Sequence, residues 1–392
     1  MIEELARPEV IDFILQHETE DTAQLILSHS KTKYLPIALA AAQIQSRKKA
    51  KTKLPEWYAA QGVLFPHGIP IEQCSSEITA KYKATLIQGN SLVDLTGGTG
   101  IDTYYLSKQF QSTSYIEQNQ ELCDLALHNF GALNSKIDVV HSSAENFLAT
   151  LNASIDWIYI DPARRDQNKR KVFRIEDCTP NLIELQDILQ EKSKGVLIKY
   201  SPLLDISEIT RSVPNIDEIN IVSVNNECKE LLIVLKKSSS DIKIRTINFQ
   251  GTEKQIFDFH PKEENECSIT LSLPQQYLYE PNSSIMKAGA FKIIAKKYNL
   301  NKLHPNSHLY TSEKLVENFP GRIFQVIGMA ALKKKVIRKI IPNAKANIST
   351  RNFPLSVWEI KNKLEIRDGG DIYIFATTLM NNKHMLIICN KA

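Results

Sequence analysis

The stretch that decides the fold is "VDLTGGTGID", residues 93–102. An apolar run ends at the carboxylate of Asp94, glycines follow at positions 97, 98 and 100, and helix-forming sequence comes next. A glycine turn between a strand and a helix lets backbone N–H groups approach a nucleotide-like ligand closely. The sequence therefore predicts a ligand-binding turn, and the flanking segments have to distinguish among the ligands.

Strand-like and helix-like segments alternate around this turn, and their short connections predict a parallel sheet with helices on both faces. Two further runs, residues 215–224 and 228–237, meet near "NN" and predict a terminal antiparallel hairpin. This plan resembles the Rossmann-like, seven-stranded sheet of class I S-adenosylmethionine (SAM) methyltransferases, whereas an ordinary NAD domain lacks the hairpin. The strand-like runs before the hairpin are "SLVDL" (91–95), "STSYIE" (112–117), "IDVVH" (137–141), "IDWIYI" (155–160) and "GVLIKY" (195–200).

The regions on either side of this α/β domain have different patterns. Helical periodicity ends at "LFPHGIP" (64–70), and the polar "KKSSSDIK" (236–243) marks a second boundary. Beyond the second boundary, "CSITLSL" (267–273) predicts a strand and "SIMKAGAFKIIAKKY" (284–298) predicts a helix. Near the end of the chain, Ser356 and Glu359 have the spacing of a capping box. We predict a helical N-terminal domain (1–70), the methyltransferase-like domain (71–237), a mixed linking segment (238–321) and a small α+β module (322–392).

Composition and charge limit the class of protein. The 392 residues are 43% hydrophobic and 23% charged, which is typical of a soluble chain with several domains. We find no signal peptide and no long apolar run, so we expect a cytoplasmic protein without a membrane partner. The six cysteines form no C-x-x-C pair, which argues against a zinc or disulfide framework.

The net charge of +4 is unevenly distributed along the chain. Residues 322–392 hold 13 lysines and arginines against 4 aspartates and glutamates, and "RKKAKTK" (47–53) is a second basic run. Basic segments of this kind suit a polyanionic partner such as RNA. The alternative is that both segments are ordinary solvated surfaces.

The spacing of the glycines favours SAM over other nucleotide ligands. The NAD pattern G-x-G-x-x-G would put the bulky Thr103 at its third glycine, and no G-K-[ST] follows for a P-loop. The methyltransferase pattern aligns instead with Asp94, Thr96, Gly98 and Gly100, with Thr96 replacing the first glycine. We predict that these residues and Asp102, in the same stretch, belong to a SAM site.

Two further acids follow the next strands and are predicted to contact the cofactor. Glu117 ends the second strand, where it could accept hydrogen bonds from both ribose hydroxyls, although an NAD site would use the same acid. Ala144 and Glu145 follow the third strand and suit the adenine edge. Alternatively, Glu117 is a plain strand-end acid and Glu145 a first-turn helix acid stabilised by the dipole.

The fourth strand ends in "IYIDPARR" (158–165), which we interpret as the catalytic segment. Asp161 and Pro162 resemble the D-P-P-aromatic motif of base-amino methyltransferases, with Ala163 and Arg164 at the last two positions. A carboxylate there could hold a nucleophilic amine, and an arginine plane could stack on a base. We predict Asp161, Pro162 and Arg164 as catalytic residues, with Asp161 also in the cofactor site. The alternatives are an ordinary turn and, for the basic residues 164–174, a solvated loop.

Other nucleophiles and metal ligands have weaker support. Cys178 could be a thiolate for carbon-5 methylation of pyrimidines, but its spacing is not diagnostic and a buried cysteine is the simpler interpretation. His304 and His308 flank Pro305 in a predicted loop with no completing acid, so we expect no metal site.

Taken together, the motifs resemble a bacterial family of class I SAM-dependent methyltransferases with a THUMP-like C-terminal domain. The resemblance covers residues from about 60 to the C-terminus and rests on "QCSSEITAKYKA", "DLTGGTGID", "YIDPARR", "FRIEDCTPNL", "YLYEPNSSIMKAGAF", "NSHLYTS" and "GGDIYIFATT". It implies SAM as the cofactor and the four-part architecture above, with a ferredoxin-like segment at residues 238–321 and a THUMP-like module at residues 322–392. True THUMP domains bind RNA.

The predicted function is SAM-dependent methylation of structured RNA, rRNA or tRNA, at a base nitrogen. One alternative is a methyltransferase for a small molecule or a protein, against which the basic C-terminal module argues. The other is a non-catalytic RNA-binding protein with a vestigial SAM fold, against which Asp94, Glu117 and Asp161 argue.

Overall fold

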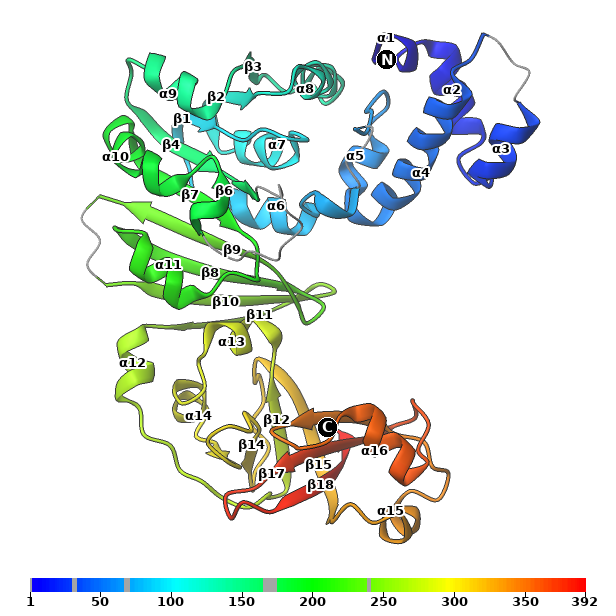
Figure 1. Cartoon of the computed structure of the whole chain (residues 1–392), viewed down its shortest axis with the longest axis vertical. Coiled ribbons are helices and arrows are strands. Elements are labelled where there is room, and N and C mark those ends of the chain that lie inside the picture. The colour runs from blue at the N-terminus through cyan, green and yellow to red at the C-terminus, as the bar shows by residue number, and fades with distance from the viewer. Residues whose placement is uncertain (1, 30–33, 67–70, 165–174, 238–240) are drawn as a thin grey trace. The chain divides into compact units, whose positions relative to one another are not determined.

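The structure is a computed structural model that describes residues 2–29, 34–66, 71–164, 175–237 and 241–392 (Figure 1). The chain divides into two compact units. The first comprises residues 1–217 and 232–240, and the second comprises residues 218–231 and 241–392. In these described ranges, no helix has both the length and the apolar character needed to cross a membrane.

The first 60 residues form short helices around a shared apolar core, as their periodicity predicts. Val10, Ile14, Leu25 and Ile44 are buried together. Asp21 caps one helix by accepting hydrogen bonds from two backbone amides of its first turn. The helices are α1 (Ile2–Leu5), α2 (Pro8–Gln16), α3 (Thr22–Ser28), α4 (Ile37–Lys53) and α5 (Pro55–Ala59).

A large sheet follows, and its strands in the described ranges have the order β11-β10-β8-β9-β7-β4-β1-β2-β3. β1 pairs in parallel with β2 and with β4, and β4 pairs in parallel with β7. Parallel strands end at one edge of the sheet, so the residues after β1, β2, β3 and β4 come together there. The strands are β1 (Gly89–Asp94), β2 (Phe110–Glu117), β3 (Asp138–His141), β4 (Ile155–Ile160), β7 (Ser193–Tyr200), β8 (Ile216–Val224), β9 (Glu227–Lys236), β10 (Lys243–Gln250) and β11 (Glu253–Phe259).

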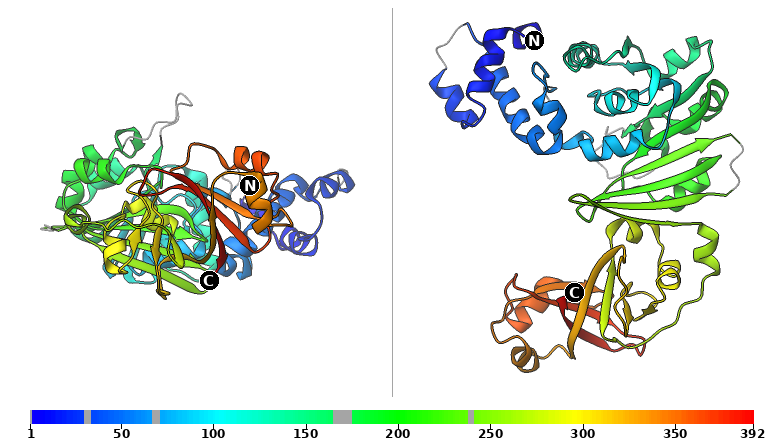
Figure 2. Two further views of the ribbon diagram at one scale, coloured as in Figure 1. Left: turned by 90° about the horizontal axis from the view of Figure 1, so that it is seen from below. Right: turned by 180° about the vertical axis from the view of Figure 1, so that it is seen from behind.

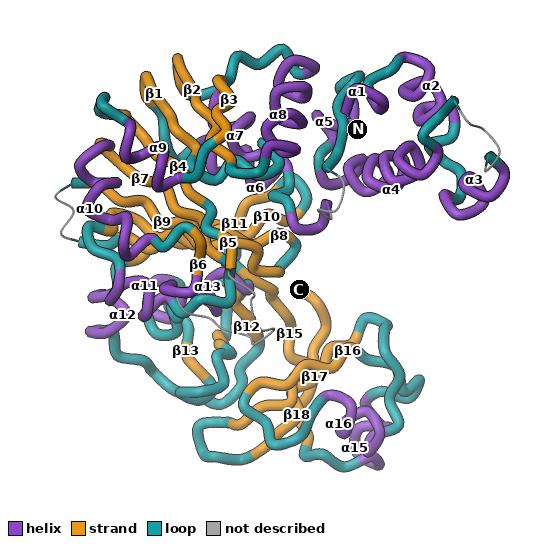
Figure 3. Tube along the Cα trace, turned by 45° about the horizontal axis from the view of Figure 1, so that its top comes forward, coloured by secondary structure: helices purple, strands orange, loops and turns teal. Residues whose placement is uncertain are grey.

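Helices cover both faces of the parallel part of this sheet. Figures 1 and 3 show α6, α7 and α8 on one side of strands β1 to β4, and α9 and α10 on the other. The predicted α/β class is therefore confirmed in its layers as well as in the parallel pairing of these strands. The helices are η1 (Ile71–Gln73), α6 (Glu77–Ala84), α7 (Ile101–Ser107), α8 (Gln120–Ala132), α9 (Ala144–Thr150), α10 (Leu182–Lys192) and α11 (Ile206–Ser212).

The predicted hairpin is present, and the sheet continues beyond it. Asn225 and Asn226 form the turn between β8 and β9, both with positive φ, as a tight two-residue turn requires. Residues 243–250, which the sequence places in the linking segment, form β10 and pair in parallel with β8. Buried residues such as Ile247 and Phe249 on β10 explain why this strand extends the sheet.

The second unit contains another sheet, whose order in the described ranges is β13-β14-β12-β15-β18-β17-β16. In both views of Figure 2, α15 and α16 (orange to red) lie on one face of the C-terminal strands. The strands are β12 (Tyr277–Pro281), β13 (Asn301–Lys302), β14 (Tyr310–Ser312), β15 (Gly321–Ala330), β16 (Asn347–Arg351), β17 (Ile372–Thr378) and β18 (His384–Lys391). The helices are α12 (Pro261–Glu266), α13 (Ser283–Ala288), α14 (Ile293–Lys297), α15 (Lys334–Ile340) and α16 (Val357–Leu364).

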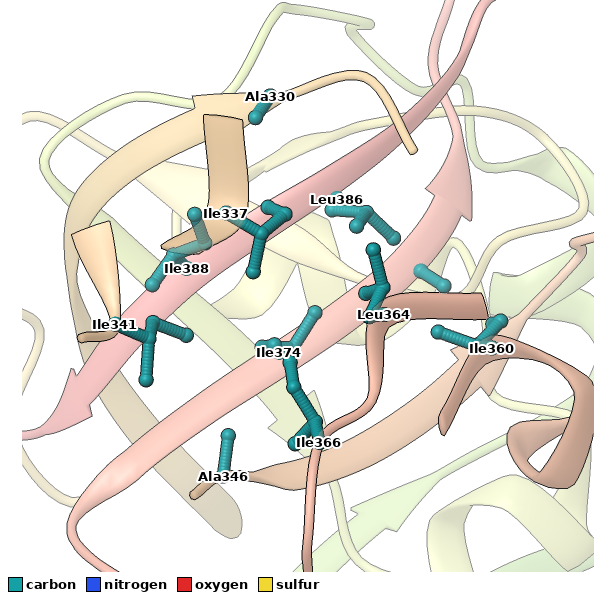
Figure 4. Packing of buried hydrophobic residues seen from close by; sticks show 11 residues of the cluster. Ala330, Ile337, Ile341, Ala346, Ile360, Leu364, Ile366, Ile374, Leu386 and Ile388 are labelled. Carbon is teal, nitrogen blue, oxygen red and sulfur yellow. The ribbon is translucent and has the colours of Figure 1, made fainter. Parts of the chain in front are cut away.

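An aliphatic cluster holds the C-terminal helices on their sheet. Figure 4 shows Ile337 of α15 and Leu364 of α16 against Ile374 of β17 and Ile388 of β18, all of them buried. The predicted capping box of α16 is present, because Ser356 and Glu359 each accept from the other's backbone amide.

Two local predictions in the second unit are wrong. The strand-like run 267–273 makes only an isolated bridge from Leu271 to Lys302, since it follows the edge of the sheet without joining it. The helix predicted over 284–298 is broken into α13 and α14, because Gly289 adopts a left-handed conformation that ends the first helix.

Candidate functional site

Asp94 holds the glycine turn in place. Its side chain is 1% exposed, and it accepts hydrogen bonds from the Thr96 amide (2.9 Å) and the Thr103 hydroxyl (2.6 Å). Burial raises the pKa of Asp94 to about 7, the two hydrogen bonds oppose that shift, and the nearby Asp102 and Asp161 add to it. Asp94 therefore stabilises the conformation of the turn through hydrogen bonds to residues on either side of the glycines.

Thr96 connects the turn to the end of β4. Its hydroxyl accepts a hydrogen bond from the Asp161 amide at 2.7 Å and lies 3.4 Å from a carboxylate oxygen of Asp94. A glycine at this position, which the common pattern would have, could not make either contact. The departure from the pattern thus links the ends of two neighbouring parallel strands.

The glycines are required at the turn for steric reasons. A Cβ on Gly97 would lie 2.2 Å from the ring of Tyr115. Gly100 has a φ of +77°, and its Cβ would lie 2.9 Å from Phe130. At Gly97, which the aligned pattern leaves unassigned, a side chain would therefore collide with the buried ring of Tyr115.

Glu117, at the end of β2, has its carboxylate held by two backbone amides. One oxygen accepts from the Gly98 amide at 2.9 Å, and the other accepts from the Asn119 amide at 2.9 Å. Each oxygen keeps a second acceptor site, because a carboxylate offers about four lone-pair positions. A pair of neighbouring hydroxyls, such as those of a ribose, could use the remaining positions.

A first pocket of about 250 Å³ opens beside Glu117. The predicted Ala144 and Glu145 contribute to it from the first turn of α9, whose N-terminus is capped by Ser143. It is lined by Leu95, Thr96, Gly98, Glu117, Gln118, Ser142, Ser143, Ala144, Glu145, Asp161, Ala163, Thr179 and Pro180. The ends of β1, β2, β3 and β4 therefore meet at this pocket.

Asp161, after β4, begins a chain of alternating charges. Its carboxylate is 2.5 Å from the ammonium of Lys199, at the end of β7, and Lys199 is 3.5 Å from Asp102. Asp102 is also 3.2 Å from the fully buried Lys83. Burial would raise the pKa of Asp102, but the ammonium groups of Lys83 and Lys199 outweigh it and lower this pKa to about 2.

A second pocket of about 190 Å³ lies over this chain of charges. It is lined by Gln73, Cys74, Ser75, Asp94, Thr96, Gly97, Gly98, Thr99, Ile101, Asp102, Tyr159, Asp161 and Lys199. Both pockets share Thr96, Gly98 and Asp161, so we describe them as two ends of one cleft. The shared residues mark its middle.

The charges of the cleft fit SAM better than NAD. Among the described residues that line the two pockets, Glu117, Glu145, Asp94, Asp102 and Asp161 are acids, and Lys199 is the only lysine or arginine. SAM carries a sulfonium and an ammonium, which acidic walls attract, whereas NAD brings an anionic pyrophosphate to the glycine turn. The residues present therefore suit SAM.

The structure brings most of the predicted residues together. Asp94, Thr96, Gly98, Asp102, Glu117, Ala144, Glu145 and Asp161 all line the cleft, and Gly100 caps α7 below it. Pro162 is buried beside Asp161, and Arg164 lies in β5 (Ala163–Arg164). The Arg164 side chain and residues 165–174, the predicted basic loop, lie outside the described residues.

Sequence reasoning missed Lys199, Lys83 and Ser75. Lys199 is the only charged residue of "GVLIKY" and comes just before its end. A charged residue near the end of a strand was a usable signal once the pairing of that strand with β4 is known. Ser75 donates to Asp102 at 2.8 Å, and Lys83 reaches Asp102 from α6. These two precede β1 by several residues, so no local pattern connects them to the glycine turn.

The alternative nucleophile and metal residues are not among those that line the cleft. Cys178 is 4% exposed in β6 (Cys178–Thr179), which pairs with β5 after a short helix, η2 (Ile175–Asp177). His304 contacts Asn352, and His308 stacks on Phe291 at 3.7 Å. Within the described ranges, no group of three or more potential ligands is arranged around a common point for a metal ion.

Comparison with known proteins supports the same architecture. A ferredoxin-like domain family matches residues 277–320, and a THUMP domain-like family matches residues 321–391. The crystal structure of a proposed methyltransferase from Porphyromonas gingivalis W83 is 33% identical, with a TM-score of 0.90, over 100% of this chain and 98% of that chain. A search of proteins with curated functions found no match.

Other solved structures are more distant. A proposed class I SAM-dependent methyltransferase from Listeria monocytogenes is 16% identical over 63% of this chain and 92% of its own, with a TM-score of 0.38. TrmK from M. capricolum, in complex with S-adenosylhomocysteine, is 14% identical over 45% of this chain and 71% of its own, with a TM-score of 0.31.

Proposed function

Because this chain belongs to the bacterial family of class I SAM-dependent methyltransferases with a THUMP-like C-terminal domain, we propose that it methylates structured RNA, rRNA or tRNA, at a base nitrogen. The observation that carries the proposal is the acidic two-ended cleft with Asp161 at its middle. The substrate class rests on the THUMP-like module and on the positive charge of residues 322–392.

The cofactor would lie along the cleft and supply an electrophilic methyl group on a sulfonium. Glu117 would accept the ribose hydroxyls, and Ala144 and Glu145 would border the adenine. Asp102 and Lys199 line the other end, where a carboxylate and an ammonium can pair with the charged groups of an amino acid. The glycine turn allows close approach of the backbone between the two ends.

Asp161 would orient the acceptor amine. Lys199 occupies one of its carboxylate oxygens. The other oxygen has no hydrogen-bond partner among the described residues, so it could accept a hydrogen bond from an exocyclic N–H. Holding the amine in line with the methyl group is a positioning effect, which is the main contribution a protein can make to such a displacement. Pro162 restricts the backbone directly after the carboxylate.

We assign different roles to the parts of the chain. Residues 71–237 would bind SAM and carry the chemistry, and residues 322–392 would hold the RNA, with residues 238–321 linking them. The helical residues 1–70 receive no separate role. In the second basic run, Arg47 pairs with Glu18 and Lys49 with Glu72, so these charges are partly compensated within the protein.

The proposal is tested by profiling modified nucleosides in total RNA from cells with and without the gene. Loss of one methylated nucleoside, restored when purified protein and SAM are added to that RNA, is the expected result. An unchanged profile, together with methyl transfer to a small molecule or a protein instead, would contradict RNA as the substrate.

Replacing Glu117 with alanine should weaken S-adenosylhomocysteine binding by about 1–3 kcal/mol, because a charged hydrogen-bond acceptor is lost. Isothermal titration calorimetry measures the change. Asp124→Ala is a matched control, since Asp124 is an exposed acid on α8 that contacts Gln120 and does not line the cleft. Equal affinities of wild type and Glu117→Ala, or tight binding of NAD, would contradict the cofactor assignment.

The basic helix α15 gives a prediction for RNA binding. RNA affinity should fall with salt with a slope of about −0.7 to −0.9 per phosphate contacted. Neutralising Lys333, Lys334, Lys335 and Arg338 should flatten this slope and leave S-adenosylhomocysteine binding intact. Because Lys334 and Arg338 already pair with Glu365, we expect Lys333 and Lys335 to account for most of the change. Coinciding slopes would exclude α15 as an RNA contact.

A further inference from the structure

A second cluster of charges lies far from the cleft in the sequence and entirely within the second unit. Its centre is Glu280 of β12, whose side chain is 3% exposed. One carboxylate oxygen accepts from the Nε (2.7 Å) and an Nη of Arg322, and the other accepts from Arg351 at 2.6 Å. Arg322 lies opposite Glu280 on the neighbouring strand β15, and Arg351 ends β16.

The two arginines are bound to Glu280 but remain partly exposed to solvent. Their side chains are 39% and 37% exposed, although the acid between them is almost completely buried. A single arginine with two hydrogen bonds to Glu280 would be enough to neutralise this carboxylate. The second, partly exposed arginine is therefore not needed for neutralisation. The buried carboxylate of Glu280 thus holds both guanidinium groups in a fixed orientation and leaves part of each side chain exposed.

The cluster has an excess of positive charge. One carboxylate faces two guanidiniums, and the Nε of Arg351 is buried without a hydrogen-bond partner among the described residues. The pKa of the neighbouring His308 is lowered to about 4, mainly by burial and further by the positive charges of Lys302 and Arg351. An anion bound at the exposed side of the arginines would compensate the excess.

Phosphate is the anion that this geometry fits. Guanidinium groups bind phosphate oxygens through paired N–H donors. Because Glu280 already orients both arginines, their side chains lose less conformational entropy when an anion binds. We propose that Arg322 and Arg351, oriented by Glu280, bind a backbone phosphate of RNA. This inference rests on the proposed function, because it takes RNA as the partner of this unit.

The test is RNA binding by the full-length protein, measured by fluorescence anisotropy with a labelled RNA hairpin of arbitrary sequence at several salt concentrations. Arg322→Lys/Arg351→Lys keeps both charges and a partner for Glu280, so the fold should be retained. It should bind about tenfold more weakly because the forked donors are lost, with little change in the salt slope. The matched control Lys254→Arg/Lys262→Arg makes the reverse exchange at two exposed positions of the same unit and should bind like wild type.

A second variant distinguishes orientation from net charge. If only net charge matters, Glu280→Gln should bind RNA more tightly, because the substitution makes the protein more positive. If Glu280 is needed to orient the two arginines, the variant should bind RNA more weakly, by about fivefold or more. Circular dichroism checks that this variant is folded. Tighter binding by folded Glu280→Gln, or wild-type affinity of the double lysine variant, would overturn the proposal.

The same samples separate this inference from the proposed function. Methyl transfer from labelled SAM to total RNA of cells lacking the gene is measured in parallel. If wild type methylates RNA and the double lysine variant binds the hairpin normally, the phosphate site is wrong and the function stands. If wild type binds the hairpin through these arginines but methylates no RNA, the function is wrong and the phosphate site stands.

Discussion

Replacing Asp161 with asparagine is expected to slow methyl transfer by a factor of about 100 or more, the size of effect seen for a positioned polar group in a reaction centre. Asparagine has one acceptor oxygen, and Lys199 would take it at the position where it now contacts the carboxylate. The NH2 group of the asparagine would then face the amine that receives the methyl group. Both groups are hydrogen-bond donors, so no hydrogen bond could form between them. The nucleophile would lose the group that orients it.

The measurement is single-turnover transfer from labelled SAM to RNA of cells lacking the gene, with S-adenosylhomocysteine affinity determined in parallel. Cofactor affinity should change much less than the rate, since Lys199 stays near Asp102 and the Asp161 amide still donates to Thr96. Asp156→Asn, within β4 and paired with Lys194, is the control and should react normally. A near-normal rate for Asp161→Asn would show that this carboxylate is structural.

Replacing Asp94 with asparagine should change how stability depends on pH. The folded-state pKa of Asp94 is raised to about 7 by burial, against an ordinary value of 3.8. The folded state therefore holds a proton that the unfolded state releases, so this contribution to stability is complete below about pH 4 and is lost as pH rises through 7. Between pH 5 and pH 8 the wild type should lose about 3 kcal/mol relative to Asp94→Asn. The loss is about 1.4 kcal/mol per pH unit below pH 7 and levels off above it.

Chemical denaturation of both proteins at pH 5, 6, 7 and 8 gives this difference. Asp156→Asn serves again as the control, because its hydrogen bond with Lys194 lowers the pKa of Asp156, so that acid is ionised in both states over the whole range. Its effect on stability should be the same at every pH. A constant difference between wild type and Asp94→Asn would mean that Asp94 is ionised in the folded protein at pH 5.

Local patterns were enough to predict the α/β class, because the signals involved span only a few residues. The apolar run before Asp94, the glycines and the "NN" turn each describe a short piece of backbone, and the class they predict is confirmed. The same locality explains the failures in the second unit. A left-handed Gly289 and an edge segment at 267–273 depend on neighbours that are distant in sequence.

The residues predicted for the cleft follow the ends of consecutive parallel strands, and a sheet of this type brings such ends to one edge. That rule placed Asp94, Glu117, Glu145 and Asp161 together without coordinates, and their individual roles stay predictions. Lys199 obeys the same rule but is separated from Asp161 by 38 positions. Its importance follows only from the adjacency of β4 and β7.

The amino-acid sequence thus determined the fold class and the cofactor, since both depend on short motifs at the ends of strands. Tertiary structure alone decided the charge balance. It set Lys83 and Lys199 against Asp102, left Asp94 buried with a raised pKa, and joined Glu280 to two arginines 42 and 71 positions away. Coulomb energies and desolvation depend on distance and burial in three dimensions, which the order of residues along the chain does not specify.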